Sequence, residues 1–348
     1  ARDAASAEGF PGYSLFQNLI VGGQDENGLA VTNDLSFMCI WASHHVFLPQ
    51  PSLSIRVWNL TPHELMIEAA KLTRTGIGLP AYYNDEVIIP SLMNRGLTLE
   101  DARTYNIIGC VEPQKAGKTD GWHDAAFFNM CRPLEFVFSQ GKDRGEQVGA
   151  VTMRVEDMTT FEEFYDAYKQ QMEYCISLLV NADNSIDTAH AIRCPLPFLS
   201  GLVDDCMKRG KTVQEGGAVY NFTGPQGFGI ANVADSLYAI KTLVFDEKKV
   251  TLAEYKRALA LNFGKGFDAI TIQEMTQDVL KELKKAGQTP SGAQIAGIVK
   301  GIAQTELSGE DRELCDRLYA MIEEVPKFGN DIDEVDAFAR DVAYTYTK

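Results

Sequence analysis

The chain has 348 residues, of which 48 are acidic and 32 are basic, so its formal net charge is −16 at pH 7. This excess of carboxylates argues against a nucleic-acid-binding surface, which needs clustered lysine and arginine. No uninterrupted apolar run reaches the ~18 residues of a membrane-spanning helix. A chain of this length can bury a large core, and its composition indicates a globular protein that acts on small molecules.

The seven cysteines are scattered and include no Cys-x-x-Cys pair. Their odd number and spacing predict reduced thiols rather than a disulfide framework or a zinc site. His44 and His45 are adjacent and would point to opposite sides of a strand, so we expect no metal site. Residues 1–9 lack the basic and then apolar pattern of a signal peptide, which favours a cytoplasmic location.

In chain order, residues 1–60 are predicted to form loops and short extended segments. Residues 61–64 have the pattern of a capping box with proline at the first helical position. The helix that follows is expected to bury Leu65, Ala69 and Leu72 on one face.

The next region is expected to alternate between helices and short strands. Residues 87–89 are predicted to form a short buried segment, and a helix over 97–105 leads into a strand at 106–108. A further helix is expected over 124–140. Arg56, Asn84 and Asp85 are polar residues among apolar neighbours, and we expect each to make structural hydrogen bonds.

The second half of the chain is predicted to be mainly helical. Capping boxes at 160–163 and 251–254 each open an amphipathic helix. Residues 212–230 are rich in glycine and aromatic residues, which favours extended backbone in a tight place. Helices are expected over 270–325 and 331–346. Helices that alternate with short apolar segments, without a repeat or linker, predict an α/β fold.

Residues 108–114 read Ile-Gly-Cys-Val-Glu-Pro-Gln and carry the candidate chemistry. In an extended segment, side chains two residues apart point to the same face, so Cys110 and Glu112 would reach one small molecule together. Gly109 permits unusual dihedral angles, and Pro113 stiffens the exit. These residues favour a catalytic loop. A buried structural cysteine beside an exposed glutamate in an ordinary turn is the alternative.

The loop and its flanks resemble the cysteine loop of glycyl radical enzymes, in the branch of dehydratases and lyases related to pyruvate formate-lyase. The resemblance starts from Gly-Cys-Val-Glu-Pro at 109–113, continues through 117–124 and includes Phe-Phe-Asn at 127–129. Further blocks resemble the family in the family's order: 17–23, 50–56, 78–86, 216–221 and 326–331.

The resemblance implies that Cys110 becomes a thiyl radical and that Glu112 is a base. It also implies that His123 and Asp124 bind the substrate, since a carboxylate at the position of Asp124 resembles one that contacts the diol in glycerol and propanediol dehydratases. A helix N-cap is the alternative role for Asp124. His123 could instead pair with Cys110 in an ordinary thiolate nucleophile.

Three phenylalanines complete the expected substrate pocket. Phe10 and Phe16 resemble pocket-wall positions of the family, although phenylalanine is more often a core residue. Phe127 stands where the choline lyases of the family have a tyrosine, which disfavours choline as the substrate.

The resemblance implies the central part of a ten-stranded α/β barrel, made of two antiparallel five-stranded half-barrels surrounded by helices. Residues 1–348 would be the middle part of that single domain. The family stores its radical on a glycine in a C-terminal Arg-Val-x-Gly-aromatic loop, and this motif does not occur in the chain. The N-terminal region and the radical loop are therefore expected to lie outside it.

The implied activity is that of a radical dehydratase or lyase, with dehydration of glycerol or 1,2-propanediol as the first expectation. Cleavage of a C–N or C–S bond (choline or isethionate), hydroxyproline dehydration and arylacetate decarboxylation are alternatives. A non-catalytic homologue or a structural module is an alternative of another class.

The resemblance also implies a glycyl radical installed by a radical S-adenosylmethionine activating enzyme that carries an iron–sulfur cluster. It further implies a homodimer, and an anaerobic cytoplasm or a bacterial microcompartment within it.

Overall fold

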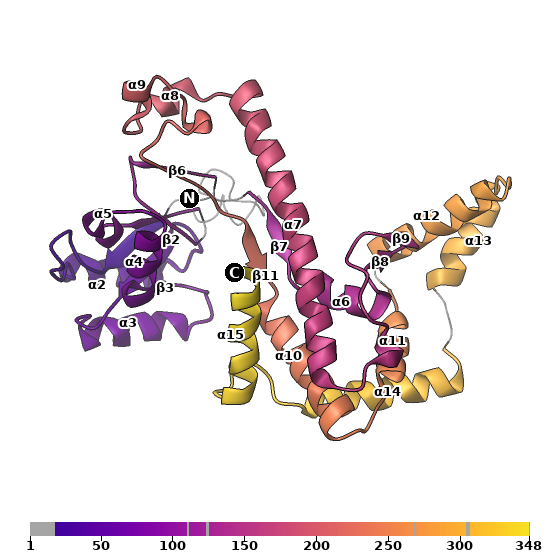
Figure 1. The fold of residues 1–348 in the computed structure, drawn as a ribbon. Helices are drawn as coiled ribbons and strands as arrows, with labels where there is room; N and C mark the ends of the chain where they lie inside the picture. Colours follow the sequence, from indigo (N-terminus) through magenta and orange to yellow (C-terminus); the bar gives the residue numbers. More distant parts are fainter. Residues whose placement is uncertain (1–17, 110, 123–124, 268, 304–306, 348) are drawn as a thin grey trace. The chain divides into compact units, whose positions relative to one another are not determined.

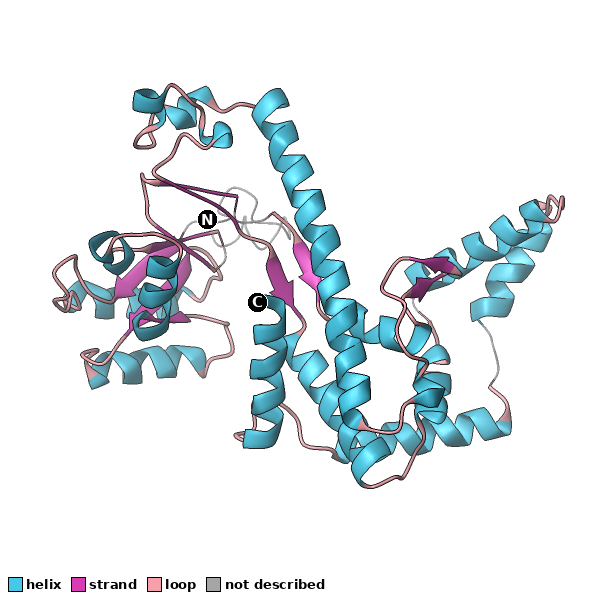
Figure 2. Ribbon diagram, viewed as in Figure 1, coloured by secondary structure: helices cyan, strands magenta, loops and turns pink. Residues whose placement is uncertain are grey.

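The computed structural model describes residues 18–109, 111–122, 125–267, 269–303 and 307–347. The chain divides into two compact units, drawn in Figure 1 and coloured by secondary structure in Figure 2. The first unit comprises 1–126 and 182–226, and the second comprises 127–181 and 227–348. The boundary crosses one long helix, α7 (Phe161–Arg193).

The first unit contains a three-stranded parallel sheet of β1 (Asn18–Gly22), β2 (Ser52–Val57) and β3 (Ala81–Asn84), in that spatial order. Helices α2 (Asp34–Val46) and α3 (His63–Thr73) share a core with one face of the sheet. Leu53 and Ile55 point into this core and are fully buried. Parallel strands buried in this way are typical of an α/β fold.

Helix α3 confirms the predicted face, because Leu65, Ala69 and Leu72 are all fully buried. The predicted capping box is wrong. The Thr61 hydroxyl instead accepts a hydrogen bond from the Trp58 N–H over 2.9 Å, so that Pro62 becomes the N-cap without a side-chain bond.

A second cluster of the first unit involves α4 (Asp85–Asn94), α5 (Leu99–Arg103) and β4 (Asn106–Ile108). Residues 87–89 lie within α4, where Ile89 is buried but Val87 is 63% exposed, so the predicted buried segment is confirmed only for Ile89. The Asn84 side chain caps α4 by accepting the Glu86 N–H. An asparagine cap followed by acidic residues stabilises a helix start. The predicted helix followed by a strand at 106–108 is confirmed, but the helix, α5, is shorter than the predicted range 97–105.

The rest of the first unit contains short elements. β5 (Glu112–Gln114) pairs antiparallel with β4, and β6 (Thr119–Trp122) pairs parallel with β10 (Tyr220–Thr223). Between α7 and β10 the backbone forms α8 (Pro197–Ser200), α9 (Cys206–Arg209) and the 3₁₀ turn η2 (Val213–Glu215).

The second unit is mostly helical (Figure 2). The predicted helix over 124–140 is shorter than expected: residues 127–129 form β7 (Phe127–Asn129), and α6 begins at Cys131 and ends at Ser139. β7 pairs with β11 (Gln226–Phe228), which explains the extended backbone here. A short hairpin joins β8 (Lys142–Asp143) to β9 (Glu146–Gln147).

The core of this unit lies among α6, α7, α10 (Ile230–Ile240), α11 (Leu252–Ala260), α14 (Gly309–Glu324) and α15 (Asp333–Thr347). Figure 1 shows α10 beside α15. Both predicted capping boxes form here: Glu163 with Thr160, and Glu254 with Thr251, exchange side-chain and backbone bonds. The remaining helical elements are η1 (Val155–Asp157), the π-helix η3 (Lys241–Asp246), η4 (Asn262–Gly264), α12 (Ala269–Lys285) and α13 (Gly292–Ala303).

In the ranges that the structure describes, the strands form one three-stranded sheet and four two-stranded sheets. The α/β class is thus seen, while closure into a ten-stranded barrel stays a prediction. Over the same ranges, no helix combines the length and the apolar character that crossing a bilayer requires.

Candidate active site

The candidate catalytic loop is the turn of a β-hairpin. Ile108 at the end of β4 is paired with Glu112 at the start of β5, so residues 109–111 connect the two strands. Gly109 takes a positive φ of 59° within this turn, a conformation that favours glycine. Whether the side chains of Cys110 and Glu112 point to the same face stays a prediction. Cys110 occupies the middle of the turn in the sequence, and its structure lies outside the described residues.

The carboxyl group of Glu112 is buried and accepts hydrogen bonds from two donors among the described residues. The Val111 N–H donates to Oε2 over 2.8 Å, and the Gln226 side-chain amide donates to Oε1. Only 7% of Glu112 is exposed, so the alternative of an exposed glutamate in an ordinary turn is wrong. A buried carboxylate needs such donors, because burial without them is costly.

Gly109 also makes room for this carboxyl group. A Cβ atom built on Gly109 would lie 2.8 Å from Oε2 of Glu112, closer than real Cβ atoms approach a neighbour. The positive φ therefore favours glycine at 109, and a larger residue would also displace the Glu112 carboxyl group.

Two successive hydrogen bonds link the parallel sheet to Gly109, the first residue of the turn. The Asn18 side-chain amide donates to the carbonyl oxygen of Gly109, and the Ser54 hydroxyl donates to Oδ1 of Asn18 over 3.3 Å. Ser54 is 1% exposed and lies on the face of β2 opposite Leu53 and Ile55. The sheet thus fixes the backbone just before Cys110.

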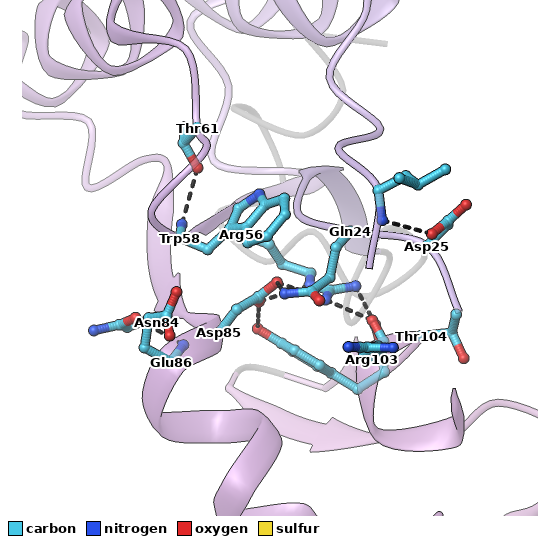
Figure 3. A network of polar contacts seen from close by, with 12 residues as sticks. Gln24, Asp25, Arg56, Trp58, Thr61, Asn84, Asp85, Glu86, Arg103 and Thr104 are labelled. Atoms are coloured by element: carbon cyan, nitrogen blue, oxygen red, sulfur yellow. Dashed lines mark hydrogen bonds and ion pairs between the residues drawn. The ribbon is translucent and has the colours of Figure 1, made fainter. Parts of the chain in front are cut away.

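A buried ion pair holds the base of the hairpin, as Figure 3 shows. Arg56 donates to both carboxylate oxygens of Asp85, over 2.9 and 2.7 Å. The Tyr105 hydroxyl donates to Asp85 over 2.8 Å, and the Arg56 guanidinium lies 4.0 Å from the centre of the Tyr105 ring. Tyr105 directly precedes β4, so the ion pair anchors the strand that leads to the turn. This confirms the structural role predicted for Arg56 and Asp85.

Two further contacts complete this anchor. Arg56 Nη2 donates to the Arg103 carbonyl over 2.6 Å, and the Gln24 amide donates to Asp85 over 3.3 Å. Burial, together with the charge of Asp85, raises the pKa of Tyr105, so its hydroxyl stays protonated and serves as a donor.

Glu112 also lines a pocket of about 370 Å³, formed entirely by the first unit. This volume is in the range of small-molecule sites. Its walls are largely apolar, and Ser91 and Arg95 of the α4 region add polar groups. The other lining residues are Val87, Ile88, Leu92, Val111, Pro113, Phe222, Thr223, Gly224, Pro225 and Gln226.

The other predicted site residues are not brought into this arrangement by the described structure. Phe10, Phe16, His123 and Asp124 lie outside the described residues. Phe127 begins β7 in the second unit and is 66% exposed. Their roles stay predictions. Among the residues that the structure does describe, no three His, Cys, Asp or Glu side chains gather as ligands for a metal ion.

Sequence reasoning missed Asn18 and Gln226, which bind the turn directly. Asn18 lies in the block 17–23, which the sequence marks only by its resemblance to the family. Gln226 lies in the glycine- and aromatic-rich segment 212–230, for which the sequence predicts only extended backbone. The pairing of a buried carboxylate with an amide over a separation of 114 residues leaves no local pattern in the sequence.

Comparison with known proteins identifies the family. The model of the pyruvate formate lyase-like family matches residues 1–348. The chain is 40% identical over 260 residues to the (2S)-3-sulfopropanediol dehydratase of Klebsiella oxytoca. That match covers 74% of this chain and 31% of the relative.

Two solved structures are similar in both fold and sequence. One, from work on 1,2-propanediol dehydration in Roseburia inulinivorans, has a TM-score of 0.85 and 64% identity, and the match covers 100% of this chain and 42% of that one. The other, a B12-independent glycerol dehydratase from Clostridium butyricum with glycerol bound, has a TM-score of 0.75 and 49% identity, with 99% and 38% covered. The chain thus spans less than half the length of these proteins, and by its sequence and its fold it belongs to the pyruvate formate lyase-like family.

Proposed function

We propose that this chain is part of a glycyl radical dehydratase that converts a vicinal diol, 1,2-propanediol or glycerol, into an aldehyde and water. The observation that carries the proposal is Glu112: a buried carboxylate, held by two donors, on the wall of a pocket two residues after Cys110. The similarity to proteins of propanediol and glycerol dehydration supports the choice of a diol.

In the proposed reaction, the Cys110 sulfur takes a hydrogen atom from the hydroxyl-bearing C1 of the diol. The glycyl radical of the family supplies the unpaired electron that this sulfur requires, and we place that glycine outside residues 1–348. Glu112 takes up the proton of the C1 hydroxyl while the C2–O bond breaks. Each of its carboxylate oxygens accepts one described bond and so keeps a lone pair for this proton.

The remaining steps balance without an external oxidant or reductant. The hydroxide that leaves C2 takes up one proton and becomes water. Glu112 releases the one proton that it received, so the cycle neither gains nor loses a proton. The C2 radical takes a hydrogen atom back from the Cys110 thiol, so the carbon skeleton ends as an aldehyde. We propose that His123, Asp124, Phe10, Phe16 and Phe127 contact the substrate during these steps.

We further propose that the sheets of this chain belong to a ten-stranded barrel, with residues 1–348 as the middle part of one domain. A radical S-adenosylmethionine enzyme would activate the complete protein, and a homodimer would be its assembled form. An anaerobic cytoplasm or a bacterial microcompartment would be its location. The family relationship supports each of these assignments.

The test uses the full-length protein that contains this chain, activated anaerobically. It is offered 1,2-propanediol, glycerol, (2S)-3-sulfopropanediol, choline, isethionate and trans-4-hydroxyproline in parallel. Electron paramagnetic resonance measures the glycyl radical, and product analysis measures turnover. We expect aldehyde from the two simple diols, and none after Cys110→Ser or Glu112→Gln. The proposal fails if the diols persist while the radical signal is present.

A further inference from the structure

We propose that Gln226 is a positioning residue for the base: its amide fixes the orientation of the Glu112 carboxylate for proton transfer. This inference rests on the proposed function of Glu112 and assigns a role to a residue that the motif around Cys110 does not contain. Gln226 lies 114 positions further along the chain, at the start of β11, and its Nε2 donates to Oε1 of Glu112.

The backbone of Gln226 is itself fixed, which makes its side chain a suitable clamp. Its N–H donates to the carbonyl oxygen of Ala126 over 2.8 Å, and Pro225 restricts the backbone directly before it. Gln226 is only partly exposed and lines the same pocket as Glu112. The amide therefore approaches the carboxylate from a defined direction.

A second donor binds the other oxygen of the Glu112 carboxylate. The Val111 N–H reaches Oε2, while Gln226 reaches Oε1, so the plane of the carboxylate is set by two donors from different parts of the chain. Without Gln226, the Val111 N–H would be the one donor to this carboxylate that remains among the described residues, and the group would be less restrained about its last bond. Proton transfer requires hydrogen-bond distance and alignment, so lost orientation lowers the rate.

A neutral amide is also a suitable hydrogen-bond donor to a carboxylate that acts as a base. A lysine or arginine at this position would form an ion pair and hold the carboxylate in its charged form, which makes it a poorer proton acceptor. A neutral amide offers a donor with less cost to basicity. Glutamine therefore combines the satisfaction of a buried carboxylate with retention of its capacity to accept a proton.

The experiment measures turnover of 1,2-propanediol by the activated full-length protein. Gln226→Leu removes the donor at similar volume, and we expect kcat per glycyl radical to fall about 10- to 100-fold, the loss typical of one hydrogen bond to a charged group. KM should change less than about 3-fold, because the variant loses alignment rather than a substrate contact. Gln214→Leu is the matched control, since Gln214 is also partly exposed and accepts one bond, from the Leu196 N–H, away from the turn.

Gln226→Glu separates positioning from a merely structural role. At neutral pH its carboxylate would repel Glu112 and donate nothing, so turnover should fall at least as far as in Gln226→Leu. As the pH is lowered and the new carboxyl group gains a proton, its O–H becomes a donor, and the ratio of variant to wild-type kcat should rise. A loss caused by misfolding would not show this recovery.

Two results overturn the inference while leaving the proposed function intact. One is a Gln226→Leu enzyme that matches Gln214→Leu in kcat per radical. The other is a Gln226→Glu enzyme whose kcat ratio does not change with pH, a result that also decides the matter if Gln226→Leu fails to accept the radical. Failure of the proposed function itself has a different signature, which is unimpaired turnover by Glu112→Gln.

Discussion

Strand β2 presents two faces that do different work. On one face, Leu53 and Ile55 are fully buried against the helices α2 and α3. On the other, Ser54 and Arg56 are also buried but polar, and they form hydrogen bonds toward the hairpin that carries the candidate loop. The comparison shows that one strand contributes stability through its apolar face and active-site geometry through its polar face.

The largest expected effect comes from removing Asp85, the ion-pair partner of Arg56 on the polar face of β2. Asp85→Leu would leave the buried Arg56 guanidinium without its counterion, and we expect the free energy of unfolding to fall by about 3–5 kcal/mol. Chemical denaturation measures this loss. The double variant Arg56→Met/Asp85→Leu removes both charges and should recover part of the stability. An equal or larger loss in the double variant would mean that the network acts through something other than charge pairing.

The matching change on the apolar face is Leu53→Ala. It leaves a cavity beside Ile55 and α3, and we expect a loss of about 3 kcal/mol in the free energy of unfolding. Because the described core cluster around Leu53 includes no residue of the hairpin, kcat per glycyl radical should remain within about 2-fold of the wild type at a temperature where the variant is folded. A selective fall in kcat would show that the two faces are not separable in function.

The same contrast explains how far the sequence could be interpreted. The buried face of α3 and the capping boxes of α7 and α11 follow from local spacing, so they could be predicted. For residues 87–89 the sequence predicts a short buried segment without its secondary structure, because three apolar residues in a row do not distinguish a strand from a helix. The cap at Asn84 decides the matter, and that signal was present in the sequence.

The site was predictable in its residue types but not in its geometry. The order Gly-Cys-Val-Glu-Pro indicated the loop and Glu112, yet it gave no sign that Glu112 opens the second strand of a hairpin. That arrangement depends on pairing between Ile108 and Glu112. The contacts made by Asn18 and Gln226 are side-chain bonds over 91 and 114 residues, and no periodicity encodes such bonds.

A smaller and purely functional effect is expected from Asn18→Leu. This variant removes the donor to the Gly109 carbonyl and the acceptor for Ser54, so the turn before Cys110 loses its link to the sheet. We expect kcat per radical to fall about 5- to 10-fold, as for loss of one neutral hydrogen bond. Asn18→Asp keeps the acceptor and loses the donor. If Asn18→Asp retains full activity, the link to Gly109 does not position the loop.

The smallest expected effect concerns the hydrogen bonds of Asp101, which hold β10, the strand that precedes Gln226. Asp101 in α5 accepts hydrogen bonds from Lys118, over 2.9 and 3.0 Å, and from the Tyr220 hydroxyl of β10, over 2.8 Å. Burial alone would raise the pKa of Asp101, but the bonds from Lys118 and Tyr220, with the nearby lysine charges, hold it below its ordinary value of 3.8. A lowered folded-state pKa means that this contribution is present above the ordinary value and is lost as the pH falls through the folded-state pKa.

Because the Lys118 side chain is 37% exposed, the contribution should be modest, below about 1 kcal/mol. Asp101→Asn should therefore lose little stability at pH 7. Its unfolding midpoint should fall less steeply than that of the wild type as the pH is lowered below about 4. Parallel acid-side curves for the two proteins would show that Asp101 does not titrate with folding. The anchor of β10 would then consist of the Tyr220 hydrogen bond rather than the charge, and Tyr220→Phe would become the variant that weakens the segment leading to Gln226.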